Sequence, residues 1–293
     1  MAPANAALAP EADACCGKIM TLLESFGGKG LITRVVSALT LLPIVLAAVW
    51  YGGYAYRALI SVAALIMFYE WLRLVRVGDR AMQGLWLAGV LAALNLLVAK
   101  NADEILVGLG FTVFMGGTIS LAGALLRRVN LVWAGVGAAY VGVPILCLWW
   151  LREQPQGAAW VMWTLLVVWA TDVGAYFAGK GIGGPRLVPR LSPNKTWAGL
   201  FGGMVLALVA ATGFANFASL GSLLWLAPGA VLLAAWSQVG DIAESAVKRY
   251  FEAKDSGSLI PGHGGLLDRV DGLVFAVPAV ALFLALSKGT TGL

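Results

Sequence analysis

Long apolar segments recur along this 293-residue chain and constrain its fold more than any other feature. A helix needs about 20 mostly apolar residues to cross the hydrocarbon core of a membrane. Nine segments approach or reach that length: 33–52, 55–72, 84–99, 104–126, 131–151, 158–178, 197–217, 222–240 and 272–288. The sequence therefore predicts an all-α, polytopic integral membrane protein with about nine transmembrane helices.

The composition supports this prediction. Apolar residues make up 60% of the chain and charged residues 12%, whereas soluble domains average about 45–50% and about 25%. So few charged residues cannot cover the surface that a soluble protein of this length exposes to water. A soluble enzyme, a disordered chain and, with three cysteines, a disulfide scaffold are excluded.

The basic residues predict the orientation of the spans. With the N-terminus inside, 16 of the 20 Lys and Arg residues fall in segments on the cytoplasmic side. This bias satisfies the positive-inside rule and predicts an N-in, C-out topology. We expect a cytoplasmic tail over 1–30, an N-terminal transmembrane bundle over 31–155, and a C-terminal region over 156–293 with cytoplasmic loops 179–196 and 241–271.

The larger polar cluster lies in the second of these loops. It combines acids, bases, glycines and the only histidine, namely Asp241, Ser245, Lys248, Arg249, Asp255, His263, Gly264, Gly265, Asp268, Arg269 and Asp271. In a helix Asp241, Ser245 and Lys248 share one face, at whose margin Glu244 lies. A solvated cytoplasmic loop is the alternative, but the interleaved residue types favour a site for Mg²⁺ and phosphate groups.

A smaller polar cluster surrounds the loop after the sixth predicted span. Asp172 lies inside an apolar run, where a charged side chain is costly. Its presence there indicates either a functional residue or the partner of a basic residue on a neighbouring helix. The segment from Ser192 to Thr196 resembles a helix start, with Ser192 as N-cap and Lys195 in the first turn. Such a start can bind phosphate, although an interfacial cap explains it equally well. Glu70 is read as an interfacial acid or a site residue.

These motifs resemble those of phosphatidate cytidylyltransferases (CDP-diacylglycerol synthases). The similarity is carried by a signature from Ser245 to Asp271, and by the stretches Asp172–Lys180 and Ser192–Trp197. The resemblance implies that CTP and phosphatidate react to CDP-diacylglycerol and pyrophosphate in phospholipid biosynthesis. It also implies Mg²⁺ as cofactor, a multi-pass protein of a bacterial inner membrane, a cytoplasmic active site and a homodimer. A second, monovalent cation is left open, and no nucleic acid is expected.

Residue roles follow from the motifs and this chemistry. Asp241 and Asp268 are expected to be the principal metal ligands. Asp241 ends the eighth predicted span and Asp268 precedes the ninth, so an antiparallel pair of helices would place the two carboxylates side by side. Asp271, Asp255 and Asp172 are expected to be lesser ligands. Catalytic roles are expected for Asp241, Lys248, Asp268 and Arg269. The residues expected to bind substrate phosphates are Ser192, Lys195, Thr196, Ser245, Arg249, His263, Gly264 and Gly265.

Two alternatives come from other classes. A cation-coupled transporter would use Asp172 and Asp241 as ion ligands, but it predicts acids near the bilayer midplane. The other is a different lipid-phosphate enzyme, such as a CTP-dependent polyprenol kinase or a CDP-alcohol phosphotransferase. A CDP-alcohol phosphotransferase would need a D-G-x-x-A-R type motif on a span, which the sequence lacks.

Overall fold

The computed structural model describes residues 41–78, 84, 85, 89, 104–257 and 264–291. Within these ranges the chain is helical apart from loops and one two-stranded hairpin. Six described helices are long and apolar enough to cross a membrane. The prediction of an all-α, multi-pass membrane protein is therefore confirmed, whereas the count of nine spans and the N-in, C-out orientation stay predictions.

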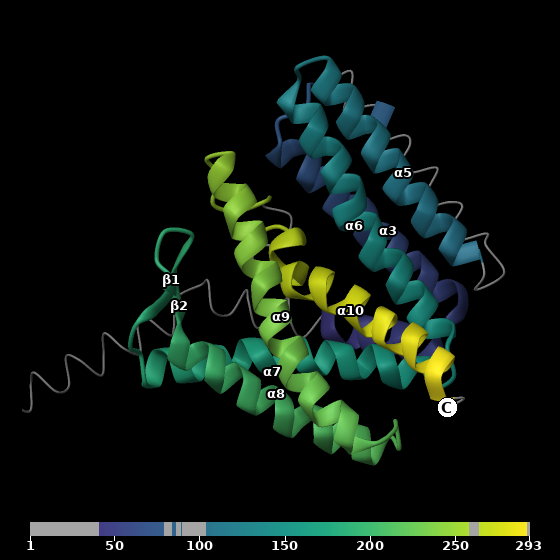
Figure 1. Ribbon diagram of the computed structural model, residues 1–293, viewed down its shortest axis with the longest axis vertical. Helices are drawn as coiled ribbons and strands as arrows, with labels where there is room; N and C mark the ends of the chain where they lie inside the picture. The colour runs from purple at the N-terminus through teal and green to yellow at the C-terminus, as the bar shows by residue number, and fades with distance from the viewer. Residues whose placement is uncertain (1–40, 79–83, 86–88, 90–103, 258–263, 292–293) are drawn as a thin grey trace, which may run out of the picture.

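The elements follow the predicted spans closely where both are described. A short apolar helix, Leu41–Tyr51, precedes them. The elements of Figure 1 are α3 (Gly53–Leu74), α5 (Glu104–Leu125), α6 (Val129–Glu153), α7 (Gly157–Gly181), β1 (Arg186–Val188), β2 (Ser192–Thr196), α8 (Trp197–Phe217), α9 (Leu223–Tyr250) and α10 (Leu267–Thr291). Most of the span predicted over 84–99, and the first part of that over 33–52, lie outside the described residues.

The loop predicted over 241–271 is shorter than expected. Helix α9 continues through Asp241 to Tyr250, and α10 already begins at Leu267. The continuation has a local cause, since residues 241–250 contain neither glycine nor proline and are mostly good helix formers. Most charged residues of this cluster are therefore held on two helices.

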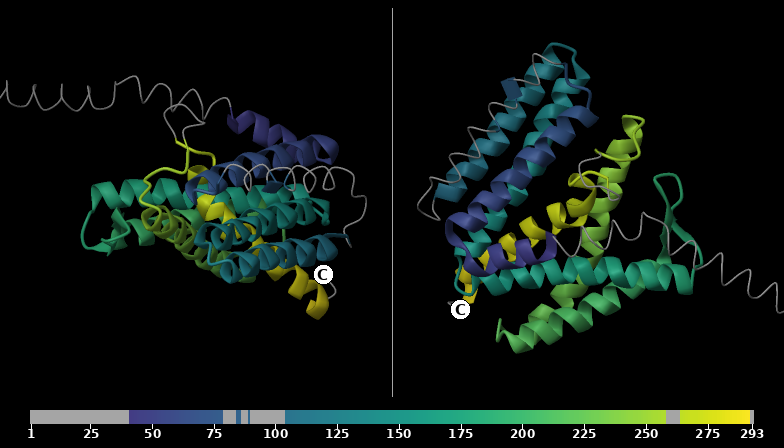
Figure 2. Two further views of the ribbon diagram at one scale, coloured as in Figure 1. Left: turned by 90° about the horizontal axis from the view of Figure 1, so that it is seen from above. Right: turned by 180° about the vertical axis from the view of Figure 1, so that it is seen from behind.

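The helices form two groups joined by α9 and α10. Helices α3, α5 and α6 lie side by side, and α7 pairs with α8, while α10 lies between the two groups and α9 crosses α8 (Figures 1 and 2). The hairpin β1–β2 stands at the end of the α7–α8 pair where the two helices are connected. Residues from both groups thus meet at α9 and α10.

Small residues allow α7 and α8 to approach closely. A side chain at Gly203 would place its Cβ 2.7 Å from the carbonyl oxygen of Thr171, and one at Gly174 would meet the carbonyl oxygen of Gly202 at 2.6 Å. In a membrane, where apolar burial does not drive helix association, such close backbone packing is a main source of stability. It fixes the position of Asp172, which lies on α7 beside this contact.

Contacts between connecting segments gather at opposite ends of the bundle. At one end, Arg152 donates a 2.7 Å hydrogen bond to the carbonyl of Val49. At the other, Arg76 donates to the carbonyl of Phe251 at 3.0 Å, and Asn130 donates to the carbonyl of Arg76 at 2.7 Å. Segments that the sequence assigns to one side of the membrane are therefore neighbours.

Candidate active site

Two polar clusters lie among α7, α9, α10 and the hairpin. The first, called the Lys248 cluster, consists of Glu244, Lys248, Ser256, Gly265 and Asp268. The second, called the Asp241 cluster, consists of Asp172, Lys195, Gln238, Asp241 and Asp271. All of the named acids come from the helices, which hold them in fixed positions.

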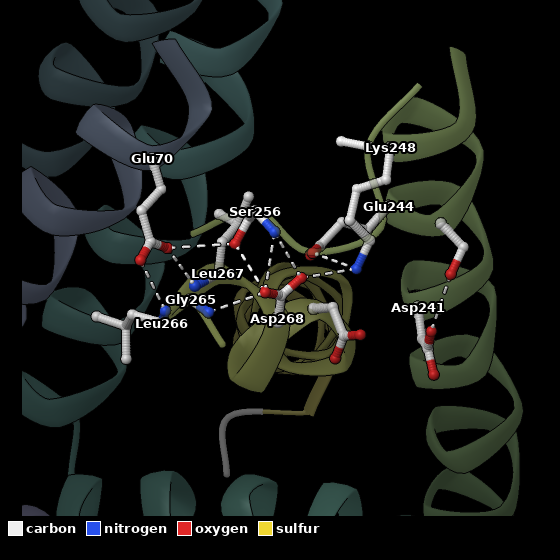
Figure 3. Close-up of polar contacts among 12 residues, drawn as sticks. Glu70, Asp241, Glu244, Lys248, Ser256, Gly265, Leu266, Leu267 and Asp268 are labelled. Carbon is white, nitrogen blue, oxygen red and sulfur yellow. Dashed lines mark hydrogen bonds and ion pairs between the residues drawn. The ribbon is translucent and has the colours of Figure 1, made fainter. Parts of the chain in front are cut away.

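Lys248 is the centre of the first cluster. Its Nζ atom lies 3.1 Å from Oε1 of Glu244 and 2.8 Å from Oδ1 of Asp268 (Figure 3). Glu244 is fully buried, and Lys248 is only 9% exposed. The Tyr140 hydroxyl of α6 donates to Glu244 at 3.3 Å. Buried charges need such partners, so Lys248 joins α9 to α10 by compensating one acid on each helix.

Asp268 receives hydrogen bonds on both carboxylate oxygens. Oδ1 accepts from Lys248, and Oδ2 accepts from the Ser256 backbone N–H and hydroxyl at 3.0 Å each and from the Gly265 N–H at 2.9 Å (Figure 3). Asp268 thus holds residues from both ends of the loop between α9 and α10. The Gly265 N–H, which the sequence suggested for phosphate, is used for this purpose.

Glu70, on α3, closes the same loop from the opposite side. Its Oε1 accepts from the Leu266 N–H at 3.0 Å, and its Oε2 accepts from the Leu267 N–H at 2.9 Å and the Ser256 hydroxyl at 3.4 Å. The side chain is 4% exposed. Glu70 therefore caps the first turn of α10, where backbone N–H groups lack helical partners and a negative charge is favoured.

The Asp241 cluster joins the hairpin to α7 and α9. Lys195, at the end of β2, is ion-paired with Asp241 and contacts the Gln238 carbonyl oxygen at 3.5 Å. The Gln238 amide in turn donates to Asp172 at 3.4 Å. Asp271 of α10 interacts electrostatically with both Asp241 and Asp172. Three helices and the hairpin therefore bring three carboxylates and one lysine together.

The N-cap predicted at Ser192 is wrong. Ser192 and Pro193 belong to β2, and α8 begins after Thr196, whose hydroxyl accepts a 3.0 Å hydrogen bond from the Gly199 N–H. The cause is the pairing of β2 with β1, which keeps the chain extended as far as Thr196. Lys195 consequently lies just before the helix rather than in its first turn.

The other predicted residues have varied surroundings. Ser245 lies one turn after Asp241 and contacts it at 3.5 Å, as the shared helical face predicted. Arg249 is exposed and donates to the Ala253 carbonyl at 3.1 Å. Gly264 has a φ of +85°, a conformation suited to glycine. Asp255 is exposed on the loop. His263 lies outside the described residues.

The charge of the two clusters suits a divalent cation. Together they contain five carboxylates and, with Arg269, three cationic side chains: Asp172, Asp241, Glu244, Asp268, Asp271, Lys195, Lys248 and Arg269. At full ionisation the formal charge is −2. Among the described residues no group of three or more His, Cys, Asp or Glu side chains is arranged to hold a metal ion. Mg²⁺ fits such a site, because it uses one or two carboxylates and completes its shell with phosphate oxygens and water.

The fold and these clusters define a multi-pass membrane protein with a partly buried charged site between its helices. Residues 32–287 match the Cytidylyltransferase family. The chain therefore belongs to the cytidylyltransferase family.

Relatives from several bacteria carry one name. The chain is 41% identical over 264 residues to the phosphatidate cytidylyltransferase of Brucella melitensis, with 87% of this chain and 93% of the relative covered. It is 30% identical over 267 residues to that of Staphylococcus epidermidis, covering 86% and 97%. The identity to the Bacillus subtilis protein of the same name is 42% over 153 residues, covering 52% and 57%.

Proposed function

We propose that this protein is a phosphatidate cytidylyltransferase, which forms CDP-diacylglycerol and pyrophosphate from CTP and phosphatidate for phospholipid biosynthesis. The observation that carries the proposal is the match to the Cytidylyltransferase family over residues 32–287, because this range includes both polar clusters. Relatives of this name are similar over nearly their whole length. Neither a transporter nor a polyprenol kinase is supported by a comparable observation.

The reaction requires two polyanions to meet. An oxygen of the phosphatidate phosphate attacks the α-phosphorus of CTP, a new P–O bond forms, and the bond to the leaving pyrophosphate breaks. The attacking phosphate is already largely ionised near neutral pH, so we assign no general base. Positioning and charge neutralisation supply most of the catalysis of such a transfer.

The cations of the site perform different tasks in this proposal. Lys195 and Arg269 neutralise substrate phosphates, and Arg249 contributes from its exposed position. Lys248 is already compensated by Glu244 and Asp268. We therefore propose that it acts mainly by holding Asp268, and hence the loop that leads into α10. Ser192, Thr196, Ser245, His263 and Gly264 are proposed to contribute polar contacts to the substrates.

Asp241, together with Asp271 or Asp172, would hold Mg²⁺, and substrate phosphates and water would complete its shell. The three carboxylates lie close enough to interact electrostatically, and Asp241 is ion-paired with Lys195. Bound there, Mg²⁺ would neutralise charge on the phosphates of CTP. We assign Asp268 to positioning rather than to the metal, because its oxygens already accept several protein hydrogen bonds. Exposed Asp255 is the ligand least supported.

We further propose that the site faces the cytoplasm of a bacterial inner membrane. The distribution of basic residues supports this orientation. A C-terminal reporter that is active only in the periplasm is the expected result, and one active only in the cytoplasm contradicts the topology. The homodimer is supported by the family resemblance alone, and cross-linking in intact membranes tests it.

The activity is tested with the purified full-length protein, CTP labelled in the α-phosphate, and phosphatidate in mixed micelles. We expect label to enter a lipid product that runs as CDP-diacylglycerol, and this product to require Mg²⁺. Absence of a labelled lipid from folded protein with Mg²⁺ present would contradict the proposed function.

A further inference from the structure

A groove beside the Lys248 cluster has the features of a lipid site. It has a volume of about 830 Å³ and runs along α3 to the segment that follows α9. Its described lining includes Val62, Leu65 and Ile66 at one end, and Arg73, Arg76 and Ser256 at the other. Ligand pockets typically have volumes of about 300–1,000 Å³, so the groove can contain much of a lipid chain.

The polarity of the groove changes along α3. From Val62 to Arg73 the helix rises about 16 Å, at about 1.5 Å per residue. This length equals about half of the hydrocarbon core of a membrane, or one leaflet. Val62 is 54% exposed and Tyr69 is 39% exposed, so the apolar part opens towards the surrounding lipid. The groove thus matches one leaflet, with its charged end at the membrane surface.

The charged end has a cation available for a phosphate group. Arg73 is exposed, and its guanidinium carbon lies 5.9 Å from the centroid of the Tyr69 ring. Arg76 is 64% exposed and lies 3.9 Å from Glu252, a distance at which an exposed pair contributes little. Two acids also line this end: Glu70 is turned to the start of α10, and Asp255 is exposed.

The groove leads to the loop that Asp268 holds. Ser256 lines the groove and donates its hydroxyl to Asp268, so the same residue belongs to the groove and to the Lys248 cluster. A headgroup bound at Arg73 therefore lies on the side of α3 that faces the Lys248 cluster. An acyl chain beside it can remain in the membrane.

We propose that this groove binds phosphatidate, with Arg73 contacting the phosphate and the wall from Val62 to Tyr69 contacting one acyl chain. Arg76 provides a second positive charge. The inference rests on the proposed function, since it names where the lipid substrate of that reaction is bound. It assigns a specificity role to α3, which contributes nothing to the signature from Ser245 to Asp271.

Photocrosslinking tests the groove without requiring catalysis. The probe is phosphatidate with a diazirine on one acyl chain, added to the full-length protein in phosphatidylcholine nanodiscs. The variant is Arg73→Gln, and the control is Arg128→Gln, an exposed arginine at the start of α6 outside the groove. We expect label on residues 62–69. Arg73→Gln should lower it by about tenfold, as for one lost charge-assisted contact, and Arg128→Gln should leave it unchanged.

Competition and kinetics complete the test. Unlabelled phosphatidate should displace the probe, whereas equal displacement by phosphatidylglycerol would overturn the substrate assignment. In mixed micelles Arg73→Gln should raise the apparent KM for phosphatidate about tenfold and leave the KM for CTP unchanged. Crosslinking outside residues 62–69, or equal crosslinking of Arg73→Gln and Arg128→Gln, would overturn the assignment of phosphatidate to this groove, even if CDP-lipid is formed. Arg73-dependent label in a protein that makes no CDP-lipid supports the groove and contradicts the proposed function.

Discussion

Glu70 and Leu267 are almost 200 positions apart in sequence, yet the Glu70 carboxylate accepts a 2.9 Å hydrogen bond from the Leu267 backbone N–H. The contact ties α3 to the first turn of α10, one residue before Asp268. The N-terminal helices are thus joined directly to the loop that carries much of the family signature. The site depends on both halves of the chain.

Replacing Glu70 by alanine should therefore destabilise the protein. It leaves the Leu266 and Leu267 N–H groups, one part-buried and one buried, without their acceptor, which should cost about 2–4 kcal/mol in total. Glu70→Gln retains one acceptor oxygen and should lie between wild type and Glu70→Ala. Thermal unfolding in detergent measures the effect, with Glu153→Gln, which removes a partly exposed ion pair to Arg57, as control. Equal Tm values for Glu70→Ala and the control would contradict the capping role.

Lys248→Ala should lower both stability and activity. It leaves buried Glu244 and Asp268 without their shared cation, and breaking a buried pair in this way costs about 3–5 kcal/mol. The variant should also lose about 2–4 kcal/mol of transition-state stabilisation, which is measured as a lower turnover rate. The double variant Lys248→Met, Glu244→Gln should recover much of the stability but not the activity. Activity of Lys248→Ala within threefold of wild type would remove the residue from the site.

Asp241→Asn should reduce turnover by at least about 100-fold, because it removes the partner of Lys195 and a proposed metal ligand. The substitution keeps the side-chain shape and lowers buried charge, so Tm should change little. Turnover is measured across a magnesium titration, with Glu252→Gln on the exposed turn after α9 as control. Wild-type rates for Asp241→Asn at every magnesium concentration would disprove the ligand assignment.

Two glycines of α8 provide a matched test of helix packing. Gly203→Ala places a Cβ 2.7 Å from the Thr171 carbonyl oxygen, so α7 and α8 must separate, at a cost of about 1–3 kcal/mol. Nothing lies within 4 Å of the corresponding Cβ at Gly213, so Gly213→Ala should be neutral or slightly stabilising. Thermal unfolding should give a lower Tm for Gly203→Ala than for Gly213→Ala. Equal Tm values for the two variants would contradict the close α7–α8 contact.

Local patterns predicted much of this structure. The spans follow from the length of the apolar segments, and the contact between Ser245 and Asp241 follows from their spacing of four on a helix. The signature from Ser245 to Asp271 identified the family. In each case the relevant residues are near neighbours in sequence, where helical periodicity governs which side chains meet.

Long-range partners were not predictable in the same way. The sequence alone marks Glu70 only as an interfacial acid or a site residue, because nothing near it in sequence indicates that it caps α10. Helical periodicity puts Glu244 only at the margin of the polar face, yet its side chain is fully buried against Lys248. Its position within the polar C-terminal part of α9 gives no such signal. At Ser192, strand pairing with β1 overrides a plausible local cap.

The most direct test of the proposed function uses CTP labelled in either the α- or the γ-phosphate, with phosphatidate, Mg²⁺ and the purified protein. We predict that the α-label enters the lipid product and that the γ-label is released as pyrophosphate, in equal amounts. Transfer of the γ-label to the lipid would instead indicate a CTP-dependent kinase, and it would contradict the assignment of this chain as a phosphatidate cytidylyltransferase.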